Sequence, residues 1–556
     1  MVPRAPIAEL HTHDVTNMPP HLGDQDLWQS DTVLRESVER EGAGWAEKEL
    51  AMFGRLTGAA ETFEKAEAAN RHPPELNAFD RYGMRINQVE FHPAYHDLMD
   101  LAISHEVPSF AWTHQGPGAQ VGHMALTYML SQAEGGVMCP MAMTYSAIPV
   151  LRANPGAGDD WIPRLLSTSY DSRDIPAAEK TGATIGMFMT EKQGGSDVRS
   201  NSTRATAIGA TTGEGVEYHL TGHKFFCSAP MSDAFLTLAY TEAGLSCFLV
   251  PRWKPDGQRN NLALQRLKNK LGNRSNASSE MEFQDTWGVM IGEEGRGIRT
   301  IIDMVQGNRL YCAVSSAAMM RQGLVQALHH TMHRSAFQKR LIQQPLMRNV
   351  LADLALESEA AVAIAMRIAR AMDEAESNEA EAALARIGTA IAKYWICKRA
   401  PSHIFEALEC HGGLGYIEES IMPRLYREAP VNSIWEGSGN VMCLDVLRAL
   451  QREAASLPTV LSELEAARGG NAALDAEIRQ LKNDLTDPDD LEARARSLTE
   501  RMSVALQASL LVQHAPSAIA DTFCASRLGN RWTGTYGVLP SGTNYDAIID
   551  RAMPAE

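Results

Sequence analysis

A change of pattern in the middle of the chain constrains the fold most strongly. Between about residues 178 and 292, short runs rich in aromatic and β-favouring residues, such as VEYHLTGHKFFCS and LSCFLVPRW, are separated by Gly, Asn and Asp. On both sides of this region, apolar residues recur at helical spacing over longer stretches. We therefore expect a compact all-β domain that lies between helical ones.

The helical half after the β region consists of long blocks. We expect helices over residues 298–333, from about 345 to 376, and over 379–410, with a glycine pair stopping the third. Their Ala-rich composition suits long helices packed side by side. Beyond about residue 450, shorter helical pieces with loop signals between them indicate an appended helical domain. The expected fold is α+β, mainly α, with an extended arm over 1–30, a helical domain over 31–177, the β domain over 178–292, a helical domain over 293–450 and the appended domain over 451–556.

The composition excludes several classes of protein. The 556 residues exceed what one hydrophobic core usually serves, and 44% of them are hydrophobic, so a globular protein of several domains is expected. A net charge of −17 disfavours a general binder of nucleic acid or anionic membranes. Eight scattered cysteines without a CxxC pair fit a reducing compartment. With no signal-peptide pattern and no apolar stretch of about 18 residues, we expect a cytoplasmic protein without a membrane span.

One loop in the β region carries chemistry. The segment GMFMTEKQGGSDVRS, residues 186–200, has paired glycines that let backbone N–H groups approach a ligand closely, and hydroxyl groups that add uncharged donors. Two interpretations stay open from these residues alone: a loop that binds a polar ligand at the end of a strand, or an ordinary Gly-rich turn. The first interpretation assigns to the site Met187, Met189, Thr190, Gly194, Gly195 and Ser196.

The same loop resembles a known family. TEKQGGSD is similar to the Thr-Glu-x-x-Gly-Ser-Asp segment that wraps the flavin of FAD in the acyl-CoA dehydrogenase superfamily. With the following SNSTRA, it looks closest to the AidB-like flavoproteins of the adaptive response to alkylation.

Two further segments of the β region carry the resemblance. GHKFFCS resembles the family's Gly-x-Lys-x-Trp-Ile-Thr strand, which implies Phe226 near the flavin ring, Ser228 with its hydroxyl on the ring, and Cys227 between them. The register of the aromatic residue stays open, because Phe225 and Phe226 are adjacent and face opposite ways. KLGNRSNASSEMEFQD, which begins at Lys270, resembles the family's KxGxRxSxTxxLxFxD.

A candidate catalytic base lies in NSIWEGSGN, residues 432–440, which resembles the family's Ile-Tyr-Glu-Gly-Thr segment. The resemblance makes Glu436 the base that removes the α proton of a saturated acyl thioester. A carboxylate suits this task when an apolar wall raises its pKa. Some relatives carry the base on an earlier helix instead, but Asn308 holds that position here and cannot serve. The neighbours of the base expected to face the flavin or the thioester are Trp435, Gly437, Ser438 and Asn440.

The segments expected to hold the phosphate end of the cofactor match the family motifs less closely. Arg334 and Phe337 resemble the Arg-x-Gln-Phe-Gly segment that holds FAD phosphate from a neighbouring subunit, and a guanidinium fork matches phosphate oxygens. Gly412 and Gly413 resemble the Gly-Gly pair of a later Gln-x-x-Gly-Gly-x-Gly-Tyr segment, in which Glu409 replaces the Gln. The first segment also has its Gln and Gly replaced, by Ala336 and Gln338. Because an acid near a pyrophosphate is unfavourable, we expect this end of FAD to be held differently here.

Three side-chain groups leave alternatives open. His329 and His333 stand four residues apart on a helix, either as metal ligands or, several times more often, as a solvated or hydrogen-bonded pair; no metal is expected. Arg448 either turns towards the active cavity or, as we favour, pairs with an acid. The methionines between residues 124 and 143 are core residues by preference, or else the wall of an acyl tunnel.

The resemblance implies a helical domain, a β-barrel domain, a four-helix domain that carries FAD and a tetramer interface, and an extra helical domain. The first hypothesis is a FAD-dependent oxidoreductase in which Glu436 takes the α proton of an acyl-CoA or other acyl thioester, a β hydride passes to the flavin N5, and electrons pass to an electron-transfer flavoprotein. The alternative is a DNA-binding flavoprotein of the alkylation response with weak or vestigial dehydrogenation. Because the C-terminal part is acidic, only a local surface there, for example Arg527 and Arg531, would contact DNA.

Overall fold

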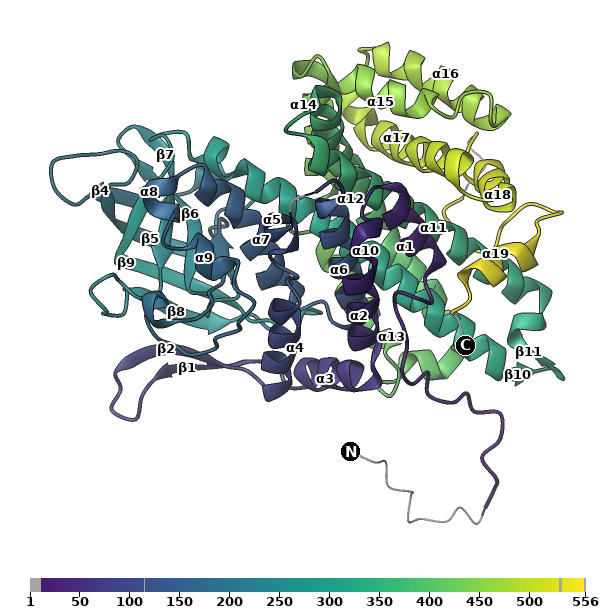
Figure 1. The fold of residues 1–556 in the computed structure, drawn as a ribbon, viewed down its shortest axis with the longest axis horizontal. Coiled ribbons are helices and arrows are strands. Elements are labelled where there is room, and N and C mark those ends of the chain that lie inside the picture. Colours follow the sequence, from purple (N-terminus) through teal and green to yellow (C-terminus); the bar gives the residue numbers. More distant parts are fainter. Residues whose placement is uncertain (1–11, 115, 530–532, 555–556) are drawn as a thin grey trace.

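The computed structural model describes residues 12–114, 116–529 and 533–554. The barrel strands gather at one end of the molecule and helices make up the rest (Figure 1). The N-terminal third contains, in chain order, α1 (Thr32–Arg40), α2 (Glu47–Gly58), α3 (Ala60–Arg71), β1 (Glu75–Phe79), β2 (Arg85–Glu90), α4 (Pro93–Ser104), α5 (Phe110–Thr113), α6 (Ala119–Ala133), α7 (Met138–Arg152), α8 (Pro155–Gly158) and α9 (Ile162–Leu165).

α6 and α7 form the buried centre of this third. Apart from Arg152 at the end of α7, and Pro149 within it, their residues are buried, because both helices are apolar on all sides. The methionines of this stretch are core residues, as preferred from the sequence; the buried ones are Met124, Met129, Met138, Met141 and Met143.

The hairpin of β1 and β2 was not foreseen in a region expected to be helical. It is joined to the barrel by polar contacts and by Val89, which is buried in the hydrophobic cluster of the barrel. Arg85 donates from Nη1 to the carbonyl oxygen of Leu264 at 2.8 Å, and Asn87 donates from Nδ2 to the carbonyl oxygen of Leu262 at 2.7 Å. A short hairpin of this kind depends on such partners, since two strands alone are marginally stable in water.

The middle of the chain forms a closed barrel. Its ring runs β4–β5–β9–β7–β6 and back to β4, while β3 is added beside β6 and β8 beside β9. β6 and β7 are almost wholly buried, as continuous apolar runs require. The sequence patterns predicted four of these strands, β5, β6, β7 and β9, and β3 was expected only as the strand that ends in the loop over 186–200; β4 and β8 were missed. The bounds are β3 (Ile185–Phe188), β4 (Arg204–Ala207), β5 (Glu217–Ser228), β6 (Ala234–Thr241), β7 (Gly244–Pro251), β8 (Leu262–Leu267) and β9 (Ser278–Ile291).

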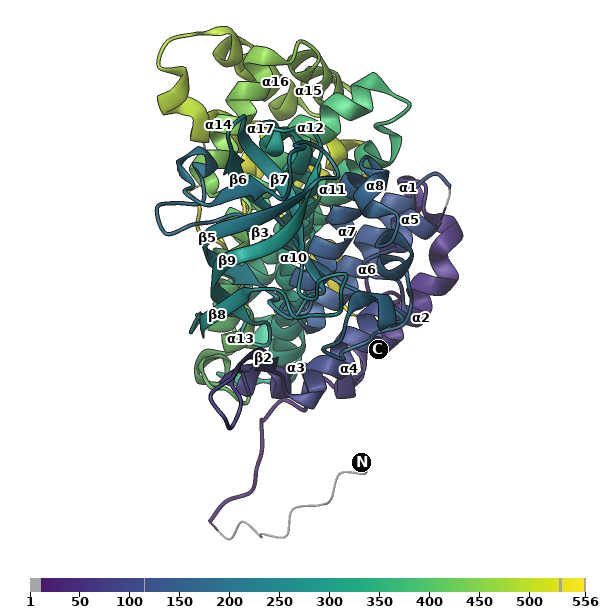
Figure 2. The same cartoon turned by 90° about the vertical axis from the view of Figure 1, so that its left-hand side faces the viewer.

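Long helices follow the barrel and pack beside α6 and α7 (Figure 2). α10 (Gly297–His333) contacts α6, α7, α11 (Pro345–Glu374) and α12 (Glu379–Glu409), so it is the central helix of this part. The three long helices match the predicted blocks to within two residues. They are followed by the short α13 (Met422–Glu428) and by α14 (Gly439–Arg452), with two-residue strands β10 (Ser335–Ala336) and β11 (Lys339–Arg340) between α10 and α11.

The last hundred residues add five helices against α11, α12 and α14: α15 (Ser456–Glu465), α16 (Ala472–Thr486), α17 (Leu491–His514), α18 (Ser517–Arg527) and α19 (Tyr545–Ala552). Here one sequence expectation is wrong. Arg527, expected on a surface that could contact DNA, is 6% exposed. Its guanidinium group is paired with Asp353 and, at 3.1 Å, with Glu357, both on α11. Arg531 lies outside the described residues.

The eight cysteines are all buried and free of disulfide bonds. Throughout the described ranges, no helix combines the length and the apolar composition that crossing a membrane requires.

Candidate active site

The loop that carries Glu436 is held in an unusual conformation. Glu436 has φ of 55°, in the left-handed region that costs a non-glycine residue about 1–3 kcal/mol. Two buried cations hold the backbone on either side. Lys393 of α12 donates from Nζ to the carbonyl oxygens of Trp435 (2.9 Å) and Gly437 (2.6 Å), and Arg309 of α10 donates from Nε to that of Glu436 (3.1 Å). The loop is therefore fixed by helices distant in sequence.

The electrostatic setting of Glu436 suits a base. Burial raises the pKa of its carboxyl group to about 7, against the opposing charges of Lys393 and Arg309. The charge of Arg309 is shared with Asp445, whose carboxylate lies 2.9 Å from it. Asn308 is buried beside the carboxyl group and has no charge to offer. The carboxyl group is thus poised to gain or lose a proton near neutral pH.

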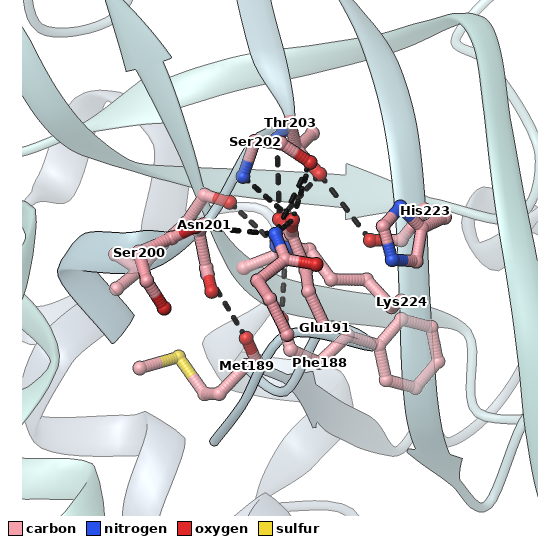
Figure 3. A network of polar contacts seen from close by, with 12 residues as sticks. Phe188, Met189, Glu191, Ser200, Asn201, Ser202, Thr203, His223 and Lys224 are labelled. Atoms are coloured by element: carbon pink, nitrogen blue, oxygen red, sulfur yellow. Dashed lines mark hydrogen bonds and ion pairs between the residues drawn. The ribbon is translucent and has the colours of Figure 1, made fainter. Parts of the chain in front are cut away.

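The loop over 186–200 is organised by a residue that the sequence reasoning did not single out, Glu191. Its carboxylate is buried and accepts hydrogen bonds from the backbone N–H of Ser202 (2.6 Å) and the hydroxyl of Thr203 (2.6 Å), as Figure 3 shows. Lys224 of β5 lies 2.9 Å from it and is itself buried. Burial opposes ionisation, but Lys224 and these hydrogen bonds lower the pKa of Glu191 to about 2. The hydroxyl-rich SNST run, residues 200–203, is the sequence feature that could have pointed to a buried acceptor such as Glu191.

We expect Glu191→Gln to lower the free energy of unfolding by about 1–3 kcal/mol, because it leaves Lys224 as a buried charge without an anion. Urea unfolding measures this, with the exposed Glu214→Gln as the matched control. Ionised Glu191 stabilises the fold fully above about pH 4.5, and this contribution disappears as the pH falls towards 2. The difference between wild type and variant should shrink over the same range; equal stability at neutral pH would contradict the role given to Glu191.

The structure brings several predicted site residues together. Met187 of β3 and Met189 just after it pack against the same hydrophobic cluster as Trp435, although about 250 residues separate them from it in the chain. Gly195 presses on Thr190: a Cβ at this position would lie 2.5 Å from the Thr190 hydroxyl. The loop therefore needs glycine there to keep its shape.

Three hydroxyl groups are available around this cluster. The hydroxyl groups of Thr190 and Ser196 have no hydrogen-bond partner within the part of the chain that is described, whereas the backbone carbonyl of Thr190 accepts from the N–H of Phe225 at 2.8 Å. Ser228 is partly exposed at the end of β5. Its hydroxyl oxygen lies 3.2 Å from the hydroxyl oxygen of Ser278. These donors, with the paired glycines and an apolar floor, can hold a large ring system with polar edges.

The conformation of strand β5 shows which of its two adjacent aromatic residues faces outward, and it shows that Cys227 faces the barrel core. Phe226 is 49% exposed, so it is the aromatic that faces outward and could meet a ligand. Cys227, expected among the cofactor contacts, is fully buried in the barrel core, because successive side chains of a strand point to opposite faces. Its thiol cannot reach a ligand at the barrel surface. Only the backbone of Cys227 remains a candidate cofactor contact.

Another set of predicted residues lies far from this cluster within one chain. Arg334 and Phe337 belong to the β10–β11 hairpin, at the opposite end of the helices from the barrel in Figure 1. Arg334 donates from Nη1 to the carbonyl oxygen of Asn17 at 2.6 Å, so the N-terminal arm holds it. Phe337 is 94% exposed. Gly412 and Gly413 leave open space where a Cβ would be.

The remaining candidates are placed as follows. Ser438 precedes the first residue of α14, and Asn440 accepts a hydrogen bond from Arg496 of α17 at 2.7 Å. His329 is hydrogen-bonded to the carbonyl oxygen of Pro20 at 2.8 Å, which agrees with a hydrogen-bonded histidine pair. Glu409 is exposed at the end of α12.

Arg448 is exposed, and the ion pair that we favoured for it is not formed with any described acid. It lines a cavity of about 370 Å³ together with Arg199 and Arg452, and with Glu492 as the one acid. Three guanidinium groups against one carboxylate make this cavity cationic on a protein that is acidic as a whole.

A barrel that stands between two helical parts in chain order, with a glutamate loop and a glycine- and hydroxyl-rich loop packed on one hydrophobic cluster, defines an acyl-CoA dehydrogenase-type oxidoreductase. Family models agree: the AidB N-terminal domain matches residues 17–172, the acyl-CoA dehydrogenase middle domain matches 186–286 and the C-terminal domain matches 295–451. The chain is 46% identical to AidB of Escherichia coli (strain K12) over 94% of its own length and 95% of that protein. It belongs to the acyl-CoA dehydrogenase family, as an AidB-like member.

Solved structures show the same fold. ACDH-11 of Caenorhabditis elegans, in complex with C11-CoA, has a TM-score of 0.84 at 25% identity, with 97% of both chains covered. An acyl-CoA dehydrogenase of Bacillus anthracis complexed with FAD has a TM-score of 0.66 at 18% identity, over 86% of this chain and 85% of that one, which shows likeness of fold alone. The predicted family, the fold class and the class of enzyme, a flavoprotein oxidoreductase of acyl-CoA dehydrogenase type, are confirmed.

Proposed function

We propose that the chain binds FAD against Met187, Met189 and Trp435, and oxidises an acyl thioester with Glu436 as its base. The residues fit the cofactor: unpartnered hydroxyls at Thr190 and Ser196 supply donors for its polar edge, and the glycine that packs on Thr190 leaves no room for a side chain. Membership of the acyl-CoA dehydrogenase family and the complex of the C. elegans protein with C11-CoA support the assignment. FAD, when bound, supplies the hydride acceptor.

The observation that carries the proposal is the Glu436 carboxyl group, on a loop whose backbone Lys393 and Arg309 hold and which packs on the same hydrophobic cluster as the loop over 186–200. Its deprotonated form removes the α proton of the thioester, and the carboxyl group keeps that proton while a hydride leaves the β carbon. Lys393 and Arg309 hold the loop, so the carboxylate needs no rearrangement to act. Partial burial keeps water away from the carboxyl group, which makes it a stronger base than an exposed glutamate.

The acyl carrier is proposed to be coenzyme A. Arg199 lies at the end of the loop over 186–200, and Arg448 and Arg452 lie on the helix that follows the Glu436 loop. Their cationic cavity suits the phosphate groups of a nucleotide carrier, because guanidinium groups match phosphate oxygens. The complex of the C. elegans relative with C11-CoA supports the same carrier.

The remaining parts of the proposal concern organisation. We infer domain divisions near residues 30, 177, 292 and 450, a homotetramer in which Arg334, Phe337, Gly412 and Gly413 serve the FAD phosphates of a neighbouring subunit, and a cytoplasmic location. Electrons are proposed to leave through an electron-transfer flavoprotein. The distance of the β10–β11 hairpin from the barrel within one chain supports the contribution from a neighbour (Figure 1).

Anaerobic mixing of the purified protein with a panel of acyl-CoA thioesters tests the proposal. We expect the flavin absorbance to bleach with at least one chain length. A protein that retains FAD and bleaches with none of them would contradict the enzymatic role.

The rate of bleaching is expected to depend on pH with a fixed sign. Because burial raises the pKa of Glu436 to about 7, the base is protonated and inactive below that pH. At saturating acyl-CoA, the rate should rise as the pH increases through about 7 and fall about tenfold for each unit below it. Stopped-flow measurements from about pH 5.5 to about pH 8.5 decide, and a flat profile would exclude Glu436 as the titrating base.

DNA binding, the alternative function, gains no support from the appended helices. Arg527 is buried in ion pairs, so it offers no contact to a phosphate backbone. If the protein binds duplex DNA at low salt and binding weakens steeply as salt is added, DNA binding is established. If it binds no duplex at low salt, this alternative function is excluded.

A further inference from the structure

The structure contains a buried chain of hydrogen bonds that leads from a lysine to the proposed flavin site. Lys270 lies in the loop between β8 and β9 and points its ammonium group into the protein. Its Nζ lies 2.7 Å from the carbonyl oxygen of Asn276, 3.1 Å from Asn273 Oδ1 and 3.1 Å from Ser278 Oγ. An ammonium group has three N–H donors and no acceptor, so all three are used.

The next link is fixed by strand pairing. Ser278 of β9 is directly opposite Ser228 of β5 in the antiparallel pair, and their hydroxyl oxygens are 3.2 Å apart. Since Ser278 Oγ accepts from Lys270, its own hydrogen is free to be donated to Ser228. The hydroxyl hydrogen of Ser228 is then free for an acceptor other than Ser278. Two are within its reach: the sulfur of Cys139, which hydrogen-bonds Ser228 but is a weak acceptor, and a ligand on the partly exposed side where the flavin is proposed to lie. The lysine thereby sets the direction of the whole chain.

The charge of Lys270 is not cancelled locally. It forms no ion pair with a carboxylate of the described residues; the nearest acids that act on it, Glu428 and Glu134, do so from a distance. Glu428 instead accepts hydrogen bonds from Asn273, from its side chain at 3.1 Å and also from its backbone N–H. Burial raises the pKa of the Cys139 thiol, which lies beside Ser228, to about 11, so no thiolate offsets the ammonium.

The loop that carries Lys270, between β8 and β9, is also packed tightly against α13. Gly272 approaches the backbone of α13 so closely that a Cβ would lie 2.3 Å from the carbonyl oxygen of Arg427. α13 leads directly into the segment that carries Glu436. The ammonium group is therefore fixed relative to both the barrel and the base loop.

We propose that Lys270 is a positioning residue for the oxidoreduction: through Ser278 it orients the Ser228 hydroxyl as a hydrogen-bond donor to the bound flavin and favours the reduced form. This inference rests on the proposed function. Reduced flavin carries more negative charge than oxidised flavin, so a directed donor and an uncompensated cation nearby both stabilise it. A role in the loop alone would not affect the reduction equilibrium.

Reductive titration of the full-length holoprotein against a dye of known potential tests the proposal. Lys270→Met keeps the length of the side chain but removes the charge and all donors. We expect the ratio of reduced to oxidised flavin at a fixed potential to fall roughly three- to tenfold. Lys270→Arg should restore most of it, and Lys48→Met, at an exposed position of α2, should leave it unchanged.

Ser278→Ala keeps two of the three hydrogen bonds of Lys270 but removes the link to Ser228. It therefore tests the proposal even if Lys270→Met fails to fold. It should lower the same ratio, and the double variant should add little to Lys270→Met, because both remove one pathway. A holoprotein whose ratio is unchanged in Lys270→Met or Ser278→Ala would overturn the relay. A wild-type protein that never binds FAD would instead overturn the proposed function.

Discussion

Replacing Glu436 with glutamine is expected to slow flavin bleaching by acyl-CoA about 10²- to 10⁴-fold, the usual contribution of a positioned general base. Glutamine has nearly the same shape and cannot take a proton. The backbone conformation should survive, since Lys393 and Arg309 hold carbonyl oxygens rather than the side chain. FAD content and thermal stability should therefore stay near those of the wild type.

The design has two controls. Glu419→Gln changes an exposed glutamate that precedes the same region and should retain full activity. The low-pH limb of the rate profile should disappear in Glu436→Gln, because the group that titrates near pH 7 is gone. Bleaching at the wild-type rate in Glu436→Gln would place the base elsewhere.

Replacing Arg527 with alanine is expected to destabilise the junction of the appended helices with α11 by about 3–5 kcal/mol, the usual cost of removing one partner of a buried ion pair. Asp353 and Glu357 are both buried. The substitution leaves Asp353 without its cation, whereas Glu357 keeps the ion pair with Arg399 at 3.4 Å. Asp353 also accepts a hydrogen bond from the backbone N–H of Gly537 at 2.9 Å, so the segment before α19 should loosen as well.

Urea unfolding followed by limited proteolysis measures this effect and locates it. Cleavage should appear first among the appended helices, and Arg527→Lys should restore little, because lysine cannot contact two carboxylates with a planar fork. The exposed Arg479→Ala, in α16, should change the free energy of unfolding by less than about 0.5 kcal/mol. Equal stability of Arg527→Ala and Arg479→Ala would contradict the role assigned to the buried pair.

Local pattern was a good guide wherever a property depends on neighbours in the chain. α10, α11 and α12 end within two residues of the predicted blocks, because long Ala- and Leu-rich stretches have strong helical periodicity. β4 and the β1–β2 hairpin were missed, since four to six mostly polar residues carry little periodic signal. Phe225 and Phe226 could not be told apart from sequence, because strand alternation leaves the phase open until the strand is paired.

The sequence by itself determined the family, the mainly α fold around a β domain, and Glu436 as the candidate base, since ordered motifs and periodicity are properties of the chain. Only the tertiary structure decided that Lys393 and Arg309 hold the Glu436 loop, that Glu191 is neutralised by Lys224, and that Arg527 is buried. Each of these depends on two groups far apart in the chain meeting at hydrogen-bond distance in a place without water. Charge pairing and pKa follow from that distance and burial, and neither is written in any local run of residues.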